Sequence, residues 1–181
     1  ILTFSHTHVS GTGGGGRYGN VGLLPFPGLP RRNGAPPFLQ PNLETHDDTV
    51  PSGETGSPGY YAADLFDGSI GVELTTSRHV GLHRYTFRGP GPSSVLVSGG
   101  AVISAGSHTP GELSPSEPWN SGGVSVGGYL EAVSDRELVG RSDFRGGWGH
   151  HKPYSVYFAV RFSEPWDSID LANRGGILQI G

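Results

Sequence analysis

The sequence predicts an all-β fold, an antiparallel β-sandwich with long loops rich in glycine and proline. Its 181 residues include 32 glycines and 15 prolines, a composition that favours turns and short strands over long helices. Residues 70–76 alternate apolar and polar side chains with the period of a half-buried strand. No segment keeps the spacing of an amphipathic helix for three turns. Many short strands with turn signals between them are typical of two packed antiparallel sheets.

The first predicted strand covers residues 21–24, and we expect Pro25 to stop it. Residues 25–58 contain many prolines and turn residues, so we expect a loop, and loops of this length are usually functional or mobile. Four side chains in this segment either bind a cation or form an exposed acidic loop: His46, Asp47, Asp48 and Glu54.

Strand signals become strong from residue 59. Predicted strands at residues 60–65 and 70–76 are joined by Asp67-Gly68, a sequence typical of hairpin turns. Further strands are expected at residues 80–87, 94–98, 101–104, 124–126, 129–133, 137–139, 154–162 and 176–180. No internal repeat is visible, which argues against a propeller or a solenoid. We therefore expect one β-sandwich domain over residues 1–181.

Charge and composition narrow the classes of function. The net charge of −4 and the pI near 6.0 argue against nucleic acid or an anionic membrane as partners. No apolar run approaches the roughly 20 residues of a membrane span. The absence of cysteine excludes disulfides and thiolate chemistry. The chain also lacks methionine and a visible signal peptide, so we expect it to be a piece of a longer polypeptide.

The opening stretch carries the first candidate site. His6 and His8 lie two apart on a predicted strand and should share a face, and four glycines follow at residues 13–16. The two histidines either line a ligand site whose floor is the glycine loop, or they are hydrogen-bonded core residues. They could also form half of a metal site, but zinc or iron needs further ligands, and no completing carboxylate lies nearby in sequence.

A second unusual stretch covers residues 145–154 and contains Trp148 between polar neighbours. The ring either stacks on a sugar or caps the edge of the core. Trp166 follows a proline and is expected to pack at an edge. No catalytic motif can be assembled, because the carboxylates are scattered along the chain: Asp64, Glu73, Asp135 and Asp143.

The opening residues FSHTHVSGTG at 4–13, with Tyr18-Gly19 after them, resemble the FSHTH-x-SGTG signature of glycoside hydrolase family-92 α-mannosidases. Three further stretches keep the order of that family. They are residues 57–61, residues 72–87 and residues 156–166. The resemblance covers nearly the whole chain, and its first motif is the specific one.

The resemblance implies an amino-terminal β-supersandwich of the galactose-mutarotase-like type, joined to a larger helical (α/α)6 domain that is not in this chain. Such enzymes are secreted or periplasmic, calcium-dependent and exo-acting, and they remove mannose from glycans with inversion. The active site lies between the two domains. The acid, the base and the calcium ligands come chiefly from the helical domain, so the resemblance assigns no catalytic and no metal-binding residue here.

The resemblance also implies that the edge bearing His6 and His8 faces the interdomain cleft, where His6, His8, Arg17 and Tyr18 would contact substrate or shape the site. Arg17 is basic, and Asn20 stands where the resemblance predicts an acidic residue. Together they favour an anionic substrate, a mannosyl-phosphate diester, beside plain α-mannosides. Two alternatives remain: a carbohydrate-binding or scaffolding β-sandwich without a catalytic role, and a metal-dependent enzyme that uses the two histidines as ligands.

Overall fold

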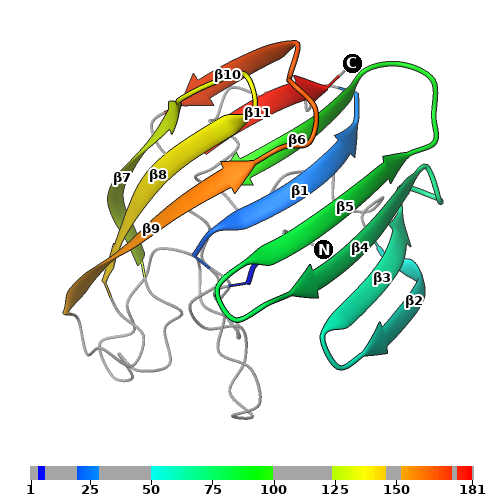
Figure 1. Ribbon diagram of the computed structural model, residues 1–181, viewed down its shortest axis with the longest axis horizontal. Coiled ribbons are helices and arrows are strands. Elements are labelled where there is room, and N and C mark those ends of the chain that lie inside the picture. The colour runs from blue at the N-terminus through cyan, green and yellow to red at the C-terminus, as the bar shows by residue number, and fades with distance from the viewer. Residues whose placement is uncertain are drawn as a thin grey trace.

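The computed structural model describes residues 4–6, 20–28, 50–99, 124–145, 152–172 and 175–180. Within these ranges all regular structure is β-strand, as Figure 1 shows, and every strand pairing is antiparallel. The predicted all-β fold is therefore confirmed. No helix among the described residues has the length and hydropathy needed to cross a membrane.

The described strands form three sheets (Figure 1). The central sheet has the order β1 (Gly22–Pro27), β6 (Ser93–Ser98), β11 (Gly175–Ile180), β10 (Ser168–Ala172). The β2–β5 sheet consists of β2 (Ser52–Ser57), β3 (Tyr60–Leu65), β4 (Ile70–Thr76) and β5 (Gly81–Phe87). The β7–β9 sheet consists of β7 (Val124–Ala132), β8 (Glu137–Arg145) and β9 (Pro153–Arg161).

Strand β6 is buried on both faces and separates two hydrophobic cores. Leu96 belongs to one core, with Leu24 of β1 and with Ile70 of β4. Val95 and Val97 belong to the other core, together with residues of the β7–β9 sheet. Because neighbouring side chains of a strand point to opposite faces, the central sheet must pack against a different sheet on each side. The predicted sandwich is confirmed, and the structure adds a third sheet to it.

The hairpin predicted at Asp67-Gly68 is confirmed. Phe66 and Asp67 both have φ of 52° and Gly68 has φ of 83°. The turn is closed by two backbone hydrogen bonds, from Gly68 N–H to the Leu65 carbonyl at 3.2 Å and from Ser69 N–H to the Phe66 carbonyl at 3.0 Å. A positive φ at Gly68 is free of steric cost, so the glycine suits the end of this turn.

Strand β1 continues through Pro25, which we expected to stop it. Proline lacks an N–H and is tolerated on an edge strand, where that N–H would not be needed for pairing. Among the described residues, β1 pairs along its length with β6 on one side and meets only Phe4, at Leu23, on the other. Pro25 lies two residues beyond Leu23, so its nitrogen faces that sparsely paired side. The expectation of a strand end at Pro25 was wrong because the sequence does not show which side of a strand is paired.

Other boundaries also differ from expectation. Strand β2 lies inside the predicted loop, and its residues are all exposed, so it carries no hydrophobic alternation that could have revealed it. Strand β10 was not predicted, β7 is continuous where two strands were expected, and β8 extends to Arg145. The strand expected at residues 101–104 lies outside the described residues.

Gly128 is the glycine that the β7–β8 pairing most clearly requires. Its φ is 141°, and a Cβ atom there would overlap the Arg141 carbonyl oxygen of β8. Gly128→Ala should therefore lower the free energy of unfolding by about 1–3 kcal/mol, measured by urea denaturation. Gly89→Ala is the control, because nothing lies within 4 Å of a Cβ at that position. Equal stability of the two variants would contradict the prediction.

Candidate functional site

The amino-terminal segment is attached to the fold by Phe4. Phe4 exchanges two backbone hydrogen bonds of 2.9 Å with Leu23 of β1, and its side chain is buried in the core beneath the β2–β5 sheet. Two residues later, His6 is exposed beside β5. Its Nε2 atom lies 2.6 Å from Nε2 of His83, a residue 77 positions away in the sequence. The candidate site is therefore built where the amino-terminal segment crosses the start of β5.

Strand β5 supplies the other two members of the site. His83, Tyr85 and Phe87 are its more buried residues, alternating with exposed neighbours, as expected for one face of a strand. Nδ1 of His83 lies 2.6 Å from the hydroxyl of Tyr85, and the Tyr85 ring packs against both hydrophobic cores. His6, His83 and Tyr85 thus form a hydrogen-bonded chain from the surface to the core, which we call the His–His–Tyr chain.

Aromatic contacts hold the imidazole of His83 in place. The ring of Phe4 meets it edge-on at a centroid distance of 6.4 Å, and the ring of Tyr85 does so at 5.6 Å. The His6 ring lies 4.7 Å from it, also edge-on. Rings packed in this way have little rotational freedom, so His83 presents its Nε2 atom to His6 in a fixed direction.

The electrostatics keep the inner part of the chain neutral. Burial, and then the nearby charge of His6, lowers the pKa of His83 to about 4. Burial also raises the pKa of Tyr85 far above its usual range. At neutral pH His83 therefore carries one ring N–H. If the proton is on Nε2, His83 donates to His6. If it is on Nδ1, His83 donates to the Tyr85 hydroxyl and its Nε2 accepts from His6. In both arrangements the proton on His83 decides which nitrogen of His6 acts as the donor.

Gly81 makes room for His6. A Cβ atom at this position would overlap the imidazole ring of His6. The glycine at the start of β5 thus lets the ring lie directly against the backbone, and a larger residue would displace it. Sequence reasoning missed Gly81, His83 and Tyr85 as site residues. The signal was the spacing Gly81-x-His83-x-Tyr85, which places all three on one face of a strand, but nothing local connects that face to His6.

Of the four residues predicted to contact substrate, the described residues include His6. His8, Arg17 and Tyr18 lie outside them, as does the glycine run at residues 13–16. The same holds for His46, Asp47, Asp48 and Trp148. Their predicted roles stay predictions, and the expectation that His6 and His8 share a face is among them.

Asn20 has a structural role. Its side chain is 1% exposed, and its amide and the Tyr154 hydroxyl hydrogen bond to each other at 3.2 and 3.4 Å. A carboxylate buried at this position would lose its hydration, so a neutral amide fits the site without reference to any substrate. Asn20 therefore no longer supports the inference of an anionic substrate, which now depends on Arg17 alone.

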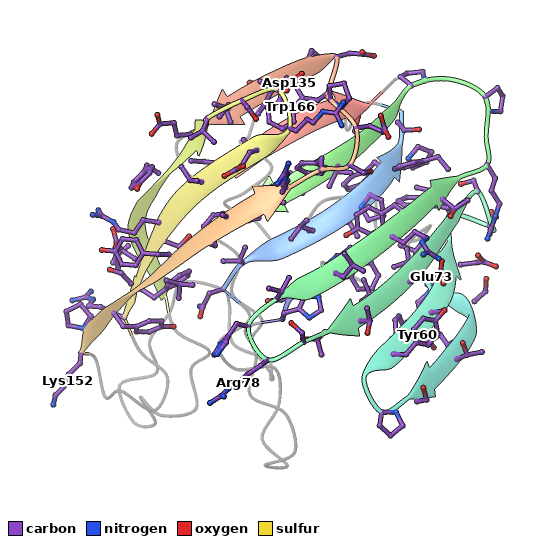
Figure 2. The ribbon with its side chains drawn as sticks, viewed as in Figure 1. Tyr60, Glu73, Arg78, Asp135, Lys152 and Trp166 are labelled. Carbon is purple, nitrogen blue, oxygen red and sulfur yellow. The ribbon has the colours of Figure 1, made fainter. Side chains whose placement is uncertain are left out.

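Several of the described carboxylates are engaged in structural pairs. Asp64 binds Arg88 at 2.7 Å, and Glu73 binds Arg84 at 3.1 Å while it accepts a hydrogen bond from Tyr60. Figure 2 shows Tyr60 and Glu73 on the β2–β5 sheet. The hydrogen bond from Tyr60 and then that from Arg84 hold the pKa of Glu73 below its usual value. Glu54 accepts a hydrogen bond from Tyr61 at 2.6 Å.

No group of three or more potential metal ligands occurs in the part of the chain that the structure describes. Trp166 packs edge-on against Phe162 at a centroid distance of 5.9 Å, on the second hydrophobic core. Its predicted edge-packing role is confirmed, and Figure 2 shows it at the opposite end of the molecule from Arg78 and Lys152.

Comparison with known protein families decides the class of this domain. The sequence profile described as the glycosyl hydrolase family 92 N-terminal domain matches residues 1–179. The chain belongs to this family. No curated protein sequence matches the chain.

Solved structures of the family share the fold of this domain. A family GH92 α-mannosidase from Bacteroides thetaiotaomicron matches with a TM-score of 0.70 and 21% identity over 99% of this chain and 24% of that chain. The complex of that enzyme with mannoimidazole gives 0.69, and the GH92 family glycosyl hydrolase ccman5 gives 0.65, both at 21% identity. The family-92 domain thus spans about a quarter of the length of these proteins.

The lowered pKa of His83 predicts a pH dependence of stability. The unfolded chain binds a proton near pH 6.5, whereas the folded domain binds it near pH 4. The contribution of neutral His83 is fully present above pH 6.5, is lost as the pH falls toward 4, and is constant below that. Between pH 7.5 and 4.5, wild type should lose about 2 kcal/mol more unfolding free energy than His83→Gln, with allowance for partial exposure.

Urea denaturation at several pH values measures this difference. His79→Gln is the matched control, because His79 is an exposed histidine in the turn just before β5. The unfolding free energy of this variant should change with pH as that of wild type does. Parallel profiles for wild type and His83→Gln would show that His83 titrates normally in the folded state.

Proposed function

We propose that this domain is the amino-terminal part of an exo-acting α-mannosidase and that its His6 edge lines the active-site cleft. The observation that carries the proposal is the family match across residues 1–179. Support comes from the His–His–Tyr chain, because a fixed imidazole at the surface can donate to or accept from a sugar hydroxyl without first being ordered. In this proposal His6, with His8, Arg17 and Tyr18, contacts the substrate, and His83 positions His6.

The residues that perform hydrolysis are assigned to another part of the protein. Inverting hydrolysis needs two carboxyl groups roughly 6.5–9.5 Å apart, one as acid and one as base. Asp64 and Glu73 are held in ion pairs, and so is Asp143. Hydrogen bonds from Tyr60 and from Ser155 hold the pKa of Glu73 and of Asp143, respectively, below the usual range, so these two are poor general acids at neutral pH. We therefore assign the acid and the base to the helical domain expected from the family.

Calcium is assigned in the same way. A calcium ion takes six to eight oxygen ligands, mostly carboxylates and carbonyls. The described residues do not fit such an ion, because no three potential ligands gather there and Asp64, Glu73 and Asp143 are each paired with an arginine. We propose that the calcium ligands lie in the helical domain, and no step here depends on the ion.

The proposed substrate is a terminal α-mannose of a glycan, either as a plain α-mannoside or linked through phosphate. Arg17 supports the second option, because a guanidinium pairs readily with a phosphodiester. We further propose that the enzyme acts outside the cytoplasm, in the periplasm or as a secreted protein, on the basis of family membership alone.

Release of mannose by the full-length protein tests the proposal. The substrates are an α-mannobiose and a mannose-phosphate-mannose diester, each with and without a calcium chelator. We expect release from at least one substrate and its loss on chelation.

If Arg17 binds the phosphate, Arg17→Ala should slow hydrolysis of the diester by about tenfold or more and leave hydrolysis of the α-mannobiose nearly unchanged. If neither substrate releases mannose, the proposed α-mannosidase activity is refuted, and a carbohydrate-binding or scaffolding role becomes the better interpretation.

Gly81→Ala tests the role of His6 without touching its imidazole. The added methyl group should displace the ring and break its hydrogen bond to His83. Because His6 is exposed, solvent can accommodate the displaced ring and the domain should stay folded, while kcat/KM for the preferred substrate should fall by about tenfold or more. Gly89→Ala should leave kcat/KM unchanged. Unchanged activity of Gly81→Ala would contradict the proposal that His6 lines the active-site cleft.

A further inference from the structure

The outer face of the β7–β9 sheet carries an unusual row of side chains. The register places Tyr129 of β7 opposite Arg141 of β8, and Arg141 opposite Tyr157 of β9. Tyr157 is 71% exposed and Tyr129 is 44% exposed, and both lie on the face opposite the core residues of their strands. Two exposed phenol rings therefore flank one guanidinium on a rigid sheet surface.

Arg141 is held in position between the rings. Its Cζ atom lies 5.7 Å from the centroid of the Tyr129 ring, and its guanidinium binds the Asp143 carboxylate at 3.0 Å. Asp143 also accepts a hydrogen bond from Ser155 at 2.6 Å. Gly127 lies opposite Asp143, and a Cβ there would be 3.2 Å from that carboxylate. The polar groups of the row are thus ordered before any ligand binds.

The neighbours of the row leave most of Tyr157 and part of Tyr129 uncovered. On one side the cross-strand positions are Gly127, Asp143 and Ser155, and on the other side they are Glu131, Val139 and Ala159. Several of these side chains are small, so they do not reach over the tyrosines. The two tyrosines stand two strands apart, roughly 9–10 Å between Cα atoms, which is about the length of a disaccharide.

We infer that the Tyr129–Arg141–Tyr157 row binds a neutral glycan chain at a site separate from the His6 edge. A pyranose presents an apolar C–H face that packs on a phenol ring, and its hydroxyls accept from a guanidinium and donate to a carboxylate. The row carries Arg141 and Asp143 as a compensated pair, so it has no net charge to attract an anionic ligand. Because Tyr and Arg are also enriched in protein interfaces, the test below includes a measurement that distinguishes a glycan site from a covered protein face.

The choice of a mannose-containing glycan rests on the proposed function, because the row itself selects only a neutral polyhydroxylated ligand. Such a site would retain a polysaccharide on the enzyme while its ends are processed elsewhere. By adding to the effective concentration of chain ends, it would act chiefly on polymeric substrates and not on short ones.

The test measures retention of the full-length protein by a soluble α-mannan in native affinity electrophoresis, with saturating free mannose to fill an exo-acting site. We expect the double variant Tyr129→Ala/Tyr157→Ala to bind the mannan about tenfold more weakly than wild type, because both stacking surfaces are lost. Tyr157→Phe keeps the ring and should retain most of the binding. Tyr60→Ala removes an exposed tyrosine from the β2–β5 sheet and should bind as wild type does.

Thermal unfolding of the same variants separates glycan binding from a covered interface. The rings are exposed, so the double variant should unfold within about 2 °C of wild type. Unchanged retention would overturn the inference, and so would a fall of several degrees, which would mean that another part of the protein packs on this face. Release of mannose by unmodified protein decides the proposed function separately, so the two ideas can fail independently.

Discussion

The burial of β6 on both faces is the constraint on which the rest of the domain depends. A strand can be covered on two sides only if its neighbouring side chains are all apolar or small, and β6 reads Ser94-Val95-Leu96-Val97-Ser98. Leu96 fixes the β2–β5 sheet against one face, and Val95 with Val97 fixes the β7–β9 sheet against the other. The far face of the β7–β9 sheet is thereby free to carry the exposed tyrosines, whereas the His6 edge lies where the more buried face of β5 reaches the surface.

The candidate site draws its rigidity from this packing. Phe4 is buried in the core that Leu96 helps to form, and this contact brings His6 to β5. Tyr85 reaches between the two cores and ends in the hydroxyl that His83 meets. Burying an imidazole costs free energy, and the hydrogen bond to Tyr85 offsets part of that cost. An exposed histidine is thus oriented by groups that are not themselves exposed, which is the arrangement that preorganised sites require.

Two of the ion pairs in the described part of the domain serve the architecture. Arg84 with Glu73 ties the neighbouring strands β5 and β4, and Arg88, directly after β5, reaches across β4 to Asp64 of β3. Such exposed pairs contribute little individually to stability. Arg141 differs, because it is bound by Asp143 and also lies between two exposed aromatic rings. The contrast separates structural ion pairs from the one that we assign to ligand binding.

The sequence by itself determined the all-β class, the hairpin at Asp67-Gly68 and the family, because strand alternation, turn chemistry and the FSHTH motif are local signals. It also pointed to His6. Only the tertiary structure decided which faces are buried and which partners meet. Asn20 looked like a specificity residue until its burial against Tyr154 was known. His6 and His83 lie 77 positions apart, and the tyrosines of the β7–β9 sheet align only through strand register. Such contacts depend on long-range packing, which no local pattern encodes.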